Sequence, residues 1–170
     1  MAELTPVEKL QPCLLDRLTD DDPHNTQESR NQRVVSLHRY KRGVLRDLEW
    51  LFNASAHLPE EGKEKFRLSD YPEACQSVIN FGTRQLCGMF APDMGELERQ
   101  LAEAIQFFEP RIIRDTLDVK ASVDRHMISF EIHGDLWANP VPEQLFIKTK
   151  IDLETGQCSL GDSSDGREAP

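Results

Sequence analysis

IQFFEPRII, residues 105–113, is the stretch in which the sequence changes from a helical pattern to a strand pattern. Before it, apolar residues recur every three or four positions, as on one face of a helix. After it, they alternate with polar residues, as in a strand with one buried face. Pro110 predicts the end of the helix, because the residue before a proline is driven out of helical conformation. The order of these patterns predicts an α+β fold, with N-terminal helices packed on one face of a three-stranded antiparallel sheet.

Two long helices are predicted upstream of the sheet. The first begins after Ser36 and has Asn53 as its C-cap, and the second begins at Asp93, which forms a capping-box pattern with Glu96. Each carries an apolar residue at steps of three or four, which predicts one buried face. The two predicted apolar faces are Leu37, Tyr40, Val44, Leu48 and Leu51, and then Leu97, Leu101, Ala104, Ile105 and Phe108.

Three strands are predicted from the alternation that follows. A tight turn at 124–126 separates the first two, and a proline-bounded loop, WANPVP, precedes the third, which ends at the turn signal DLETG. The final stretch, GDSSDGREAP at residues 161–170, is polar and glycine-rich, which predicts a frayed end. The inward residues of the three strands are Leu117, Val119, Ala121 and Val123; Ile128, Phe130 and Ile132; and Leu145, Ile147, Thr149, Ile151 and Leu153.

These elements divide the chain into three expected parts. Residues 1–33 form a polar N-terminal segment, residues 34–160 form the α+β domain, and residues 161–170 form a flexible tail. Within the domain, a short helix is predicted after Pro72, with Gly82 beyond its end.

Length and charge limit the function classes. The chain has 170 residues, enough for one ordinary domain with short extensions. A net charge of −10 opposes binding to nucleic acid and to anionic lipid, so protein partners are expected. No apolar run has membrane-spanning length, and the opening residues, MAELTPVEKL, lack the basic and then apolar pattern of a signal peptide. We therefore expect a cytoplasmic protein without membrane insertion.

The cysteines do not indicate a metal site. Cys13, Cys75, Cys87 and Cys158 are widely spaced, with no C-x-x-C pair and no histidine at zinc-ligand spacing. They are expected to be reduced and mostly buried thiols, and no cofactor is predicted.

Leucines near the N-terminus form one helical turn. Leu14, Leu15 and Leu18 lie at i, i+1 and i+4 in the stretch LLDRL. A single turn is too short to be stable alone in water, so it must dock on its own domain or on another protein. The spacing alone does not decide between these two alternatives.

Glu109 and Arg111 form the second candidate site. The C-terminal end of a helix disfavours an acid by about 0.3–1 kcal/mol, so Glu109 stands in a poor place for stability alone. It either pairs internally with Arg111, at about 0–1 kcal/mol if exposed, or makes a contact to a partner that recovers the cost on assembly.

Five motifs, taken in order, resemble the TssE family of type VI secretion baseplate subunits, which are similar to a wedge protein of contractile phage-tail baseplates. The motifs are LLDRL, RDLEWLFN at 46–53, SVINFG at 77–82, FEPR at 108–111, and a D-x-x-T-G turn after the strands. The resemblance covers residues 10–158 and rests on the joint order of motifs that are individually weak.

The resemblance implies a structural role. Such proteins sit in the cytoplasmic baseplate wedge, contact TssF and TssG, with TssK as a further candidate, and help start the sheath of TssB and TssC. The family's E-P-R tripeptide maps onto Glu109, Pro110 and Arg111. Its N-terminal docking motif maps onto Leu14, Leu15, Asp16, Arg17 and Leu18. With the resemblance, the assembly contact at Glu109 and Arg111 is favoured over a purely internal pair.

Two other functions remain as alternatives, namely a peptidoglycan-cleaving, lysozyme-like enzyme and an acidic adaptor domain. Glycoside cleavage needs two carboxylates, one of them held protonated in a pocket. Glu109 is a poor general acid because the neighbouring Arg111 favours its ionised form. No nucleophile triad, phosphate loop or metal spacing is present, so the protein is expected not to be an enzyme.

Overall fold

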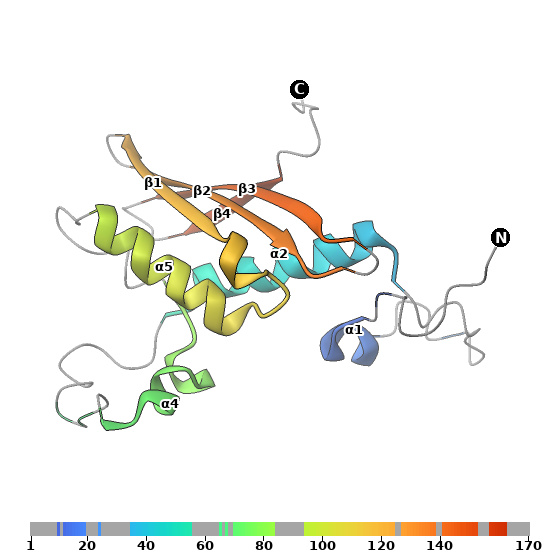
Figure 1. Cartoon of the computed structure of the whole chain (residues 1–170), viewed down its shortest axis with the longest axis horizontal. Coiled ribbons are helices and arrows are strands. Elements are labelled where there is room, and N and C mark those ends of the chain that lie inside the picture. The colour runs from blue at the N-terminus through green and yellow to red at the C-terminus, as the bar shows by residue number, and fades with distance from the viewer. Residues whose placement is uncertain are drawn as a thin grey trace.

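The computed structural model contains two long helices, several short ones and a four-stranded antiparallel sheet (Figure 1). In chain order the elements are α1 (Leu14–Leu18), α2 (Leu37–Asn53), α4 (Pro72–Cys75), η4 (Val78–Asn80), α5 (Met94–Phe108), η6 (Arg114–Thr116), β1 (Asp118–Asp124), β2 (Met127–Leu136), β3 (Glu143–Asp152) and β4 (Cys158–Asp162). The structure describes residues 10, 12–19, 24, 35–55, 65, 67, 70–83, 94–124, 127–138, 141–152 and 157–162.

The predicted first long helix is confirmed as α2. Ser36 is its N-cap, and the Ser36 hydroxyl accepts a hydrogen bond from the backbone N–H of Arg39 at 3.3 Å. The helix ends one residue later than predicted, because Asn53 is its last residue and Ala54 is the C-cap. All predicted inward residues except Leu37 are buried, and the full buried set is Tyr40, Gly43, Val44, Leu48, Leu51 and Phe52.

The second long helix, α5, ends as the proline predicts. Its last residue is Phe108, so Glu109 and Pro110 follow directly. Leu97, Leu101 and Ile105 are its buried residues, at the spacing of one helix face. The predicted N-cap, Asp93, lies outside the described residues.

The sheet is antiparallel, as predicted, but the predicted number of three strands is wrong. A fourth strand, β4, pairs with β3 in a register that sets Ile151 opposite Cys158 and Thr149 opposite Leu160. The sequence pattern predicts no element at residues 158–160 and places Gly161 and Asp162 in the tail, because the segment CSLGD is short, contains glycine and follows a turn signal. Apolar and polar residues alternate only weakly in this segment. It nevertheless forms a strand, because β3 supplies backbone hydrogen-bond partners and the Cys158 side chain is buried in the core. The strand ends at Asp162, beyond the predicted domain end at residue 160.

One face of the central strands is buried. Ile128, Phe130, Ile132 and Leu136 of β2 and Leu145, Ile147, Thr149 and Ile151 of β3 are all buried at alternate positions. All of these except Thr149 belong to the same apolar core as the buried apolar side chains of α2 and α5. In Figure 1 α5 runs along β1, and contacts join α5 to β1 and α2 to β4. The predicted inward phase fails at Val123, which is 50% exposed near the end of β1. The predicted turn at 125–126 and Leu153 lie outside the described residues.

The short helix predicted after Pro72 is two separate turns. Pro72 is at the first position of α4, as predicted, but Gln76 ends that helix and Ser77 caps the 3-10 turn η4. The chain then returns to the end of α2, where the backbone N–H of Thr83 donates to the carbonyls of Leu51 and Ala54. This hydrogen bonding anchors the turns to the domain.

Candidate partner-binding site

The segment after α5 folds back on itself through an ion pair. Glu109 is only 2% exposed, although it lies at the carbonyl end of the helix. Its carboxylate accepts hydrogen bonds from the backbone N–H of Arg111 at 3.2 Å and from Nε of the same residue at 2.6 Å. The Arg111 Nη2 also donates to Glu109 Oε2. Pro110 makes the turn that brings the guanidinium over the acid.

These hydrogen bonds explain why an acid can stand at the end of α5 without a partner from outside the chain. The sequence alone did not show them. Charge-assisted hydrogen bonds are about twice as strong as neutral ones. Three such bonds outweigh the about 0.3–1 kcal/mol by which the helix dipole disfavours the carboxylate. The argument that Glu109 needs an outside partner to justify its position is therefore wrong.

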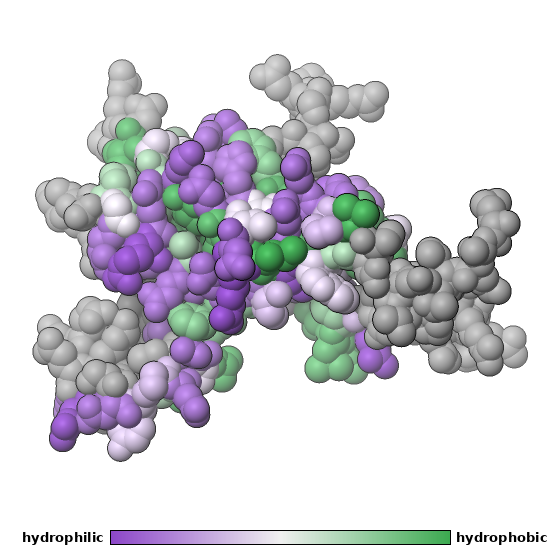
Figure 2. Space-filling model, in the orientation of Figure 1, coloured by the Kyte–Doolittle hydropathy of each residue, from purple (hydrophilic) through white to green (hydrophobic). Residues whose placement is uncertain are grey.

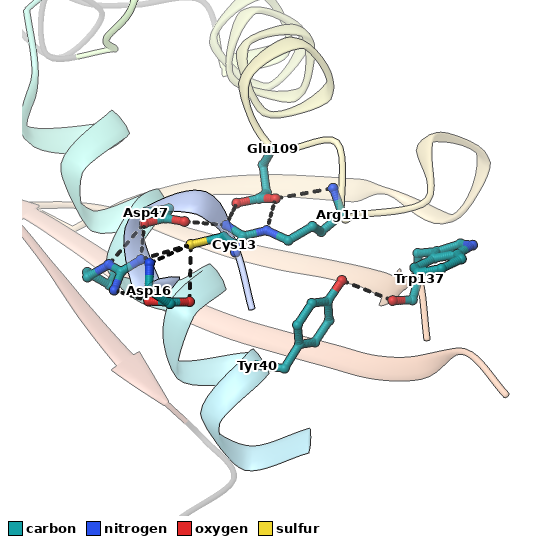
Figure 3. Close-up of polar contacts among 8 residues, drawn as sticks. Cys13, Asp16, Tyr40, Asp47, Glu109, Arg111 and Trp137 are labelled. Atoms are coloured by element: carbon teal, nitrogen blue, oxygen red, sulfur yellow. Dashed lines mark hydrogen bonds and ion pairs between the residues drawn. The ribbon is translucent and has the colours of Figure 1, made fainter. Parts of the chain in front are cut away.

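Asp47 of α2 extends the ion pair to a second arginine. Arg111 Nη2 donates to Asp47 Oδ2 at 2.5 Å. The other oxygen of Asp47 accepts hydrogen bonds from Nε and Nη2 of Arg46, at 3.0 and 2.9 Å. One carboxylate thus holds two guanidinium groups, and Figure 3 shows Asp47 beside Arg111. Arg46 also lies over the exposed ring of Trp50, with its Cζ 5.3 Å from the ring centroid.

Arg46 in turn holds α1. Its Nη1 donates to Asp16 Oδ1 at 2.6 Å, and its Nη2 lies 3.6 Å from the Cys13 sulfur. Cys13 is the N-cap of α1, because its sulfur accepts from the backbone N–H of Asp16 at 3.4 Å. The Cys13 thiol also donates to Asp16 Oδ2 at 3.1 Å. We call the five charged residues that join α5 to α1 the charge relay; they are Glu109, Arg111, Asp47, Arg46 and Asp16.

Gly43 provides the space in which Asp16 and Arg111 approach each other. A Cβ atom at this position would lie 3.3 Å from Asp16 Oδ2 and 3.7 Å from Arg111 Nη1. Both charged groups therefore rest on the same turn of α2, and the absence of a side chain at Gly43 leaves room for α1.

The charges of the relay reinforce one another. Burial lowers the pKa of Arg111, but the hydrogen bond and charge of Glu109, and those of Asp47, raise it overall. Burial likewise lowers the pKa of Arg46, while Asp16 and Asp47 raise it above its ordinary value. Burial raises the pKa of Asp16, but the hydrogen bonds from Arg46 and Cys13 bring it below its ordinary value.

The leucines of α1 point away from this polar attachment. Leu14 is 70% exposed and Leu18 is 74% exposed, and no residue of α1 is buried. Figure 2 shows a hydrophobic patch at the place that α1 occupies in Figure 1. α1 therefore docks on its own domain, but it does so through Asp16 and Cys13. Its leucine side chains are not covered by the described residues.

The structure adds Tyr40 and Trp137 to the site, and sequence reasoning did not single them out. The backbone N–H of Trp137 donates to the carbonyl of Arg111 at 2.7 Å, and the Tyr40 hydroxyl donates to the Trp137 carbonyl at 3.0 Å. The indole is 60% exposed beside the E-P-R turn, as Figure 3 shows. The one signal in the sequence was a tryptophan in a loop bounded by prolines, since exposed tryptophan is enriched at interfaces.

Acid pH is expected to loosen α1. Because the folded pKa of Asp16 is below its ordinary value of 3.8, the carboxylate stabilises the attachment fully above about pH 4. The contribution is then lost as the pH falls through the lowered folded pKa. Trp50 fluorescence, in a Trp137→Phe background, reports movement of the adjacent Arg46.

Comparison with an Asp16→Asn variant separates Asp16 from the other acids of the charge relay. The variant should lack the acid transition that Asp16 causes. An identical transition in both proteins contradicts the assignment.

The described cysteines are free thiols, as the sequence predicts. Cys13 is a partly buried free thiol and Cys158 a buried one. The side chain of Cys75 and all of Cys87 lie outside the described residues. Among the described residues, no group of three histidine, cysteine or acidic side chains is arranged to hold a metal ion. In the same part of the chain, no helix combines the length and apolar character needed to cross a bilayer.

An exposed apolar turn held to a small α+β domain by an ion network is typical of a protein that assembles with other proteins. The family described as Baseplate wedge protein gp25 matches residues 38–141, more than half of the chain. The chain therefore belongs to this family, which includes the TssE subunits, and the resemblance read from the motifs is confirmed. The match includes Asp47, Glu109 and Arg111 and leaves α1 outside. The comparison with curated proteins gave no match.

Proposed function

We propose that this protein is a TssE-type subunit of the cytoplasmic baseplate wedge of a type VI secretion system, where it binds TssF and TssG, with TssK as a further candidate. The family supports a structural baseplate role. The observation that carries the proposed partner contact is the pair of leucines, Leu14 and Leu18, presented outward on a helix that is already held in place. A preformed helix loses less conformational entropy on binding than a disordered segment.

The proposed docking segment, residues 1–33, contacts its partner through the apolar side of α1. Leu14, Leu15 and Leu18 enter an apolar groove of the partner, and the exposed Arg17 lies at the rim of the contact. Asp16 faces the domain and acts by holding the helix. The expected partner role of this residue is therefore indirect.

The E-P-R segment offers a second proposed contact. Pro110 is exposed, and the Arg111 side chain is 19% exposed, whereas Glu109 is buried. Glu109 contributes by orienting Arg111, and the partner meets Pro110, the accessible edge of Arg111 and the indole of Trp137. Aromatic and arginine side chains are the residues most enriched in interface hot spots.

Nucleation of the TssB and TssC sheath is proposed to use the outer strands, β1 and β4. An edge strand offers free backbone groups to a strand from another chain. Three backbone groups, on two residues of these strands, are occupied by helix side chains. Glu98 of α5 accepts from the Ala121 N–H at 2.7 Å, and the Asn53 amide bonds both the N–H and the carbonyl of Cys158, at 3.0 and 3.1 Å. Strand addition at either residue has to displace that side chain.

The proposed role is not catalytic. Glu109, the acid considered for glycoside cleavage, is buried and bonded to Arg111, which keeps it from donating a proton to a sugar. The structural character of the family agrees with this reading.

Pull-down of TssF and TssG tests the docking proposal. A Leu14→Asp/Leu18→Asp double variant should lose most of the recovered partner, at least about tenfold, because two interface leucines are replaced by charges. Val78→Asp is the control, since Val78 is 82% exposed on η4, and the neighbouring α4 lies far from α1 in Figure 1. Equal recovery with the double variant and wild type contradicts the docking proposal.

A further inference from the structure

The two proposed docking segments share one set of ion pairs. Asp47 Oδ2 bonds Arg111 of the E-P-R segment, and Asp47 Oδ1 bonds Arg46, which holds α1 through Asp16. Negative and positive groups alternate along this path from Glu109 to Asp16. If Arg111 loses its hydrogen bond to Asp47, the Asp47 carboxylate can move. Arg46, which this carboxylate orients, then moves with it.

α1, a five-residue helix held by a few polar contacts, is expected to exchange between a docked and an undocked state. It has only five residues, no buried residue, and a length at which a helix is unstable in isolation. Its described attachment to α2 is polar, through Asp16 and Cys13 to Arg46. The chain on either side adds a hydrogen bond from the Val35 N–H to the Leu10 carbonyl at 3.1 Å, and Leu10 packs against the core. The equilibrium between the two states thus depends strongly on how Arg46 is held.

We infer that the charge relay couples the E-P-R segment to α1, so that Asp47 and Arg46 are positioning residues for both docking segments. Two effects act in the same direction. Arg111 fixes the rotamer of Asp47, which points Arg46 Nη1 at Asp16, and the Arg111 guanidinium also lies beside Asp16 over Gly43. Releasing Arg111 therefore favours undocking of α1.

The functional consequence rests on the proposed function. If both segments bind baseplate partners, a partner at the E-P-R segment that keeps Arg111 on Asp47 strengthens binding at α1, and by thermodynamic reciprocity occupation of α1 then strengthens binding of that partner. The coupling itself is a property of the free protein. It can thus be tested without a partner, and its failure is distinguishable from a failed pull-down.

The test measures amide exchange by NMR at Arg17 and Thr19, whose N–H groups donate to the carbonyls of Cys13 and Leu15 inside α1. The variant is Glu109→Gln/Arg111→Met, which replaces the ion pair by neutral groups of similar size and avoids an unpaired buried charge. Exchange at both amides should become faster by at least about threefold, although the described hydrogen bonds of the Glu109 and Arg111 side chains go to each other and to Asp47 rather than to α1.

The matched control is Glu96→Gln/Arg99→Met. It removes an ion pair of the same residue types on α5, one that is exposed and outside the charge relay, and should leave exchange in α1 unchanged. Asp47→Asn provides a second perturbation if the first variant does not fold, and it should also accelerate exchange at Arg17 and Thr19. Unchanged α1 exchange in a folded relay variant overturns the inference.

Discussion

Replacing Arg111 by alanine is expected to lower the free energy of unfolding by about 3–5 kcal/mol, the cost of leaving one member of a buried ion pair without its partner. Glu109 is 2% exposed and takes hydrogen bonds from the Arg111 backbone N–H and from its guanidinium. Without the guanidinium, the carboxylate at the negative end of α5 has lost its compensating charge. Asp47 also loses one of its two arginines. Urea denaturation followed by circular dichroism measures the change.

Two comparisons identify the cause of that loss. Glu109→Gln/Arg111→Met should be clearly more stable than Arg111→Ala, because it removes both charges together. Arg99→Ala, at an exposed ion pair on α5, should cause no measurable loss. A loss below about 1 kcal/mol for Arg111→Ala, the size of a surface pair, contradicts the burial argument.

Gly82→Ala is the second substitution with a large expected effect, a loss of at least about 2–3 kcal/mol in unfolding free energy from backbone strain and overlap. The φ of Gly82 is +132°, in a region that residues with a side chain rarely adopt. A Cβ there would lie 2.3 Å from the carbonyl oxygen of Ala54, a backbone atom that cannot rotate away. The next residue, Thr83, is buried and bonded to Leu51 and Ala54.

The same overlap should detach the turns of α4 and η4 from the end of α2. Thermal denaturation measures the lost stability, and exchange at the Thr83 amide reports the local detachment. Gly161→Ala is the control, because a Cβ there would lie 3.4 Å from the Lys148 carbonyl oxygen, an ordinary van der Waals contact. Wild-type stability in Gly82→Ala is incompatible with this close approach.

Helix and strand periods, and the ends of the long helices, were readable from the sequence because they depend on neighbouring residues. Ser36 caps α2, and the Glu109-Pro110 step ends α5 at Phe108. The alternation in Ile128, Phe130 and Ile132 marks a buried strand face for the same reason. β4 was missed because its five residues carry too little local signal, and its place depends on pairing with β3.

The motifs also determined the family, since the order of LLDRL, SVINFG and FEPR was enough to recognise it. Their spacing did not reveal what the charged residues contact. Asp16 and Arg46 are 30 positions apart, and Asp47 and Arg111 are 64 apart, yet each pair is in hydrogen-bond contact.

The sequence by itself therefore determined the class of fold, the family and the two segments proposed to bind partners. Only the tertiary structure decided that Glu109 is buried, that the leucines of α1 face outward, and that one aspartate, Asp47, links the two segments. The physical reason is the range of the forces. Helical period and proline sterics act between near neighbours in the chain, whereas hydrogen-bonded ion pairs require approach within about 3 Å, which only the packed fold provides.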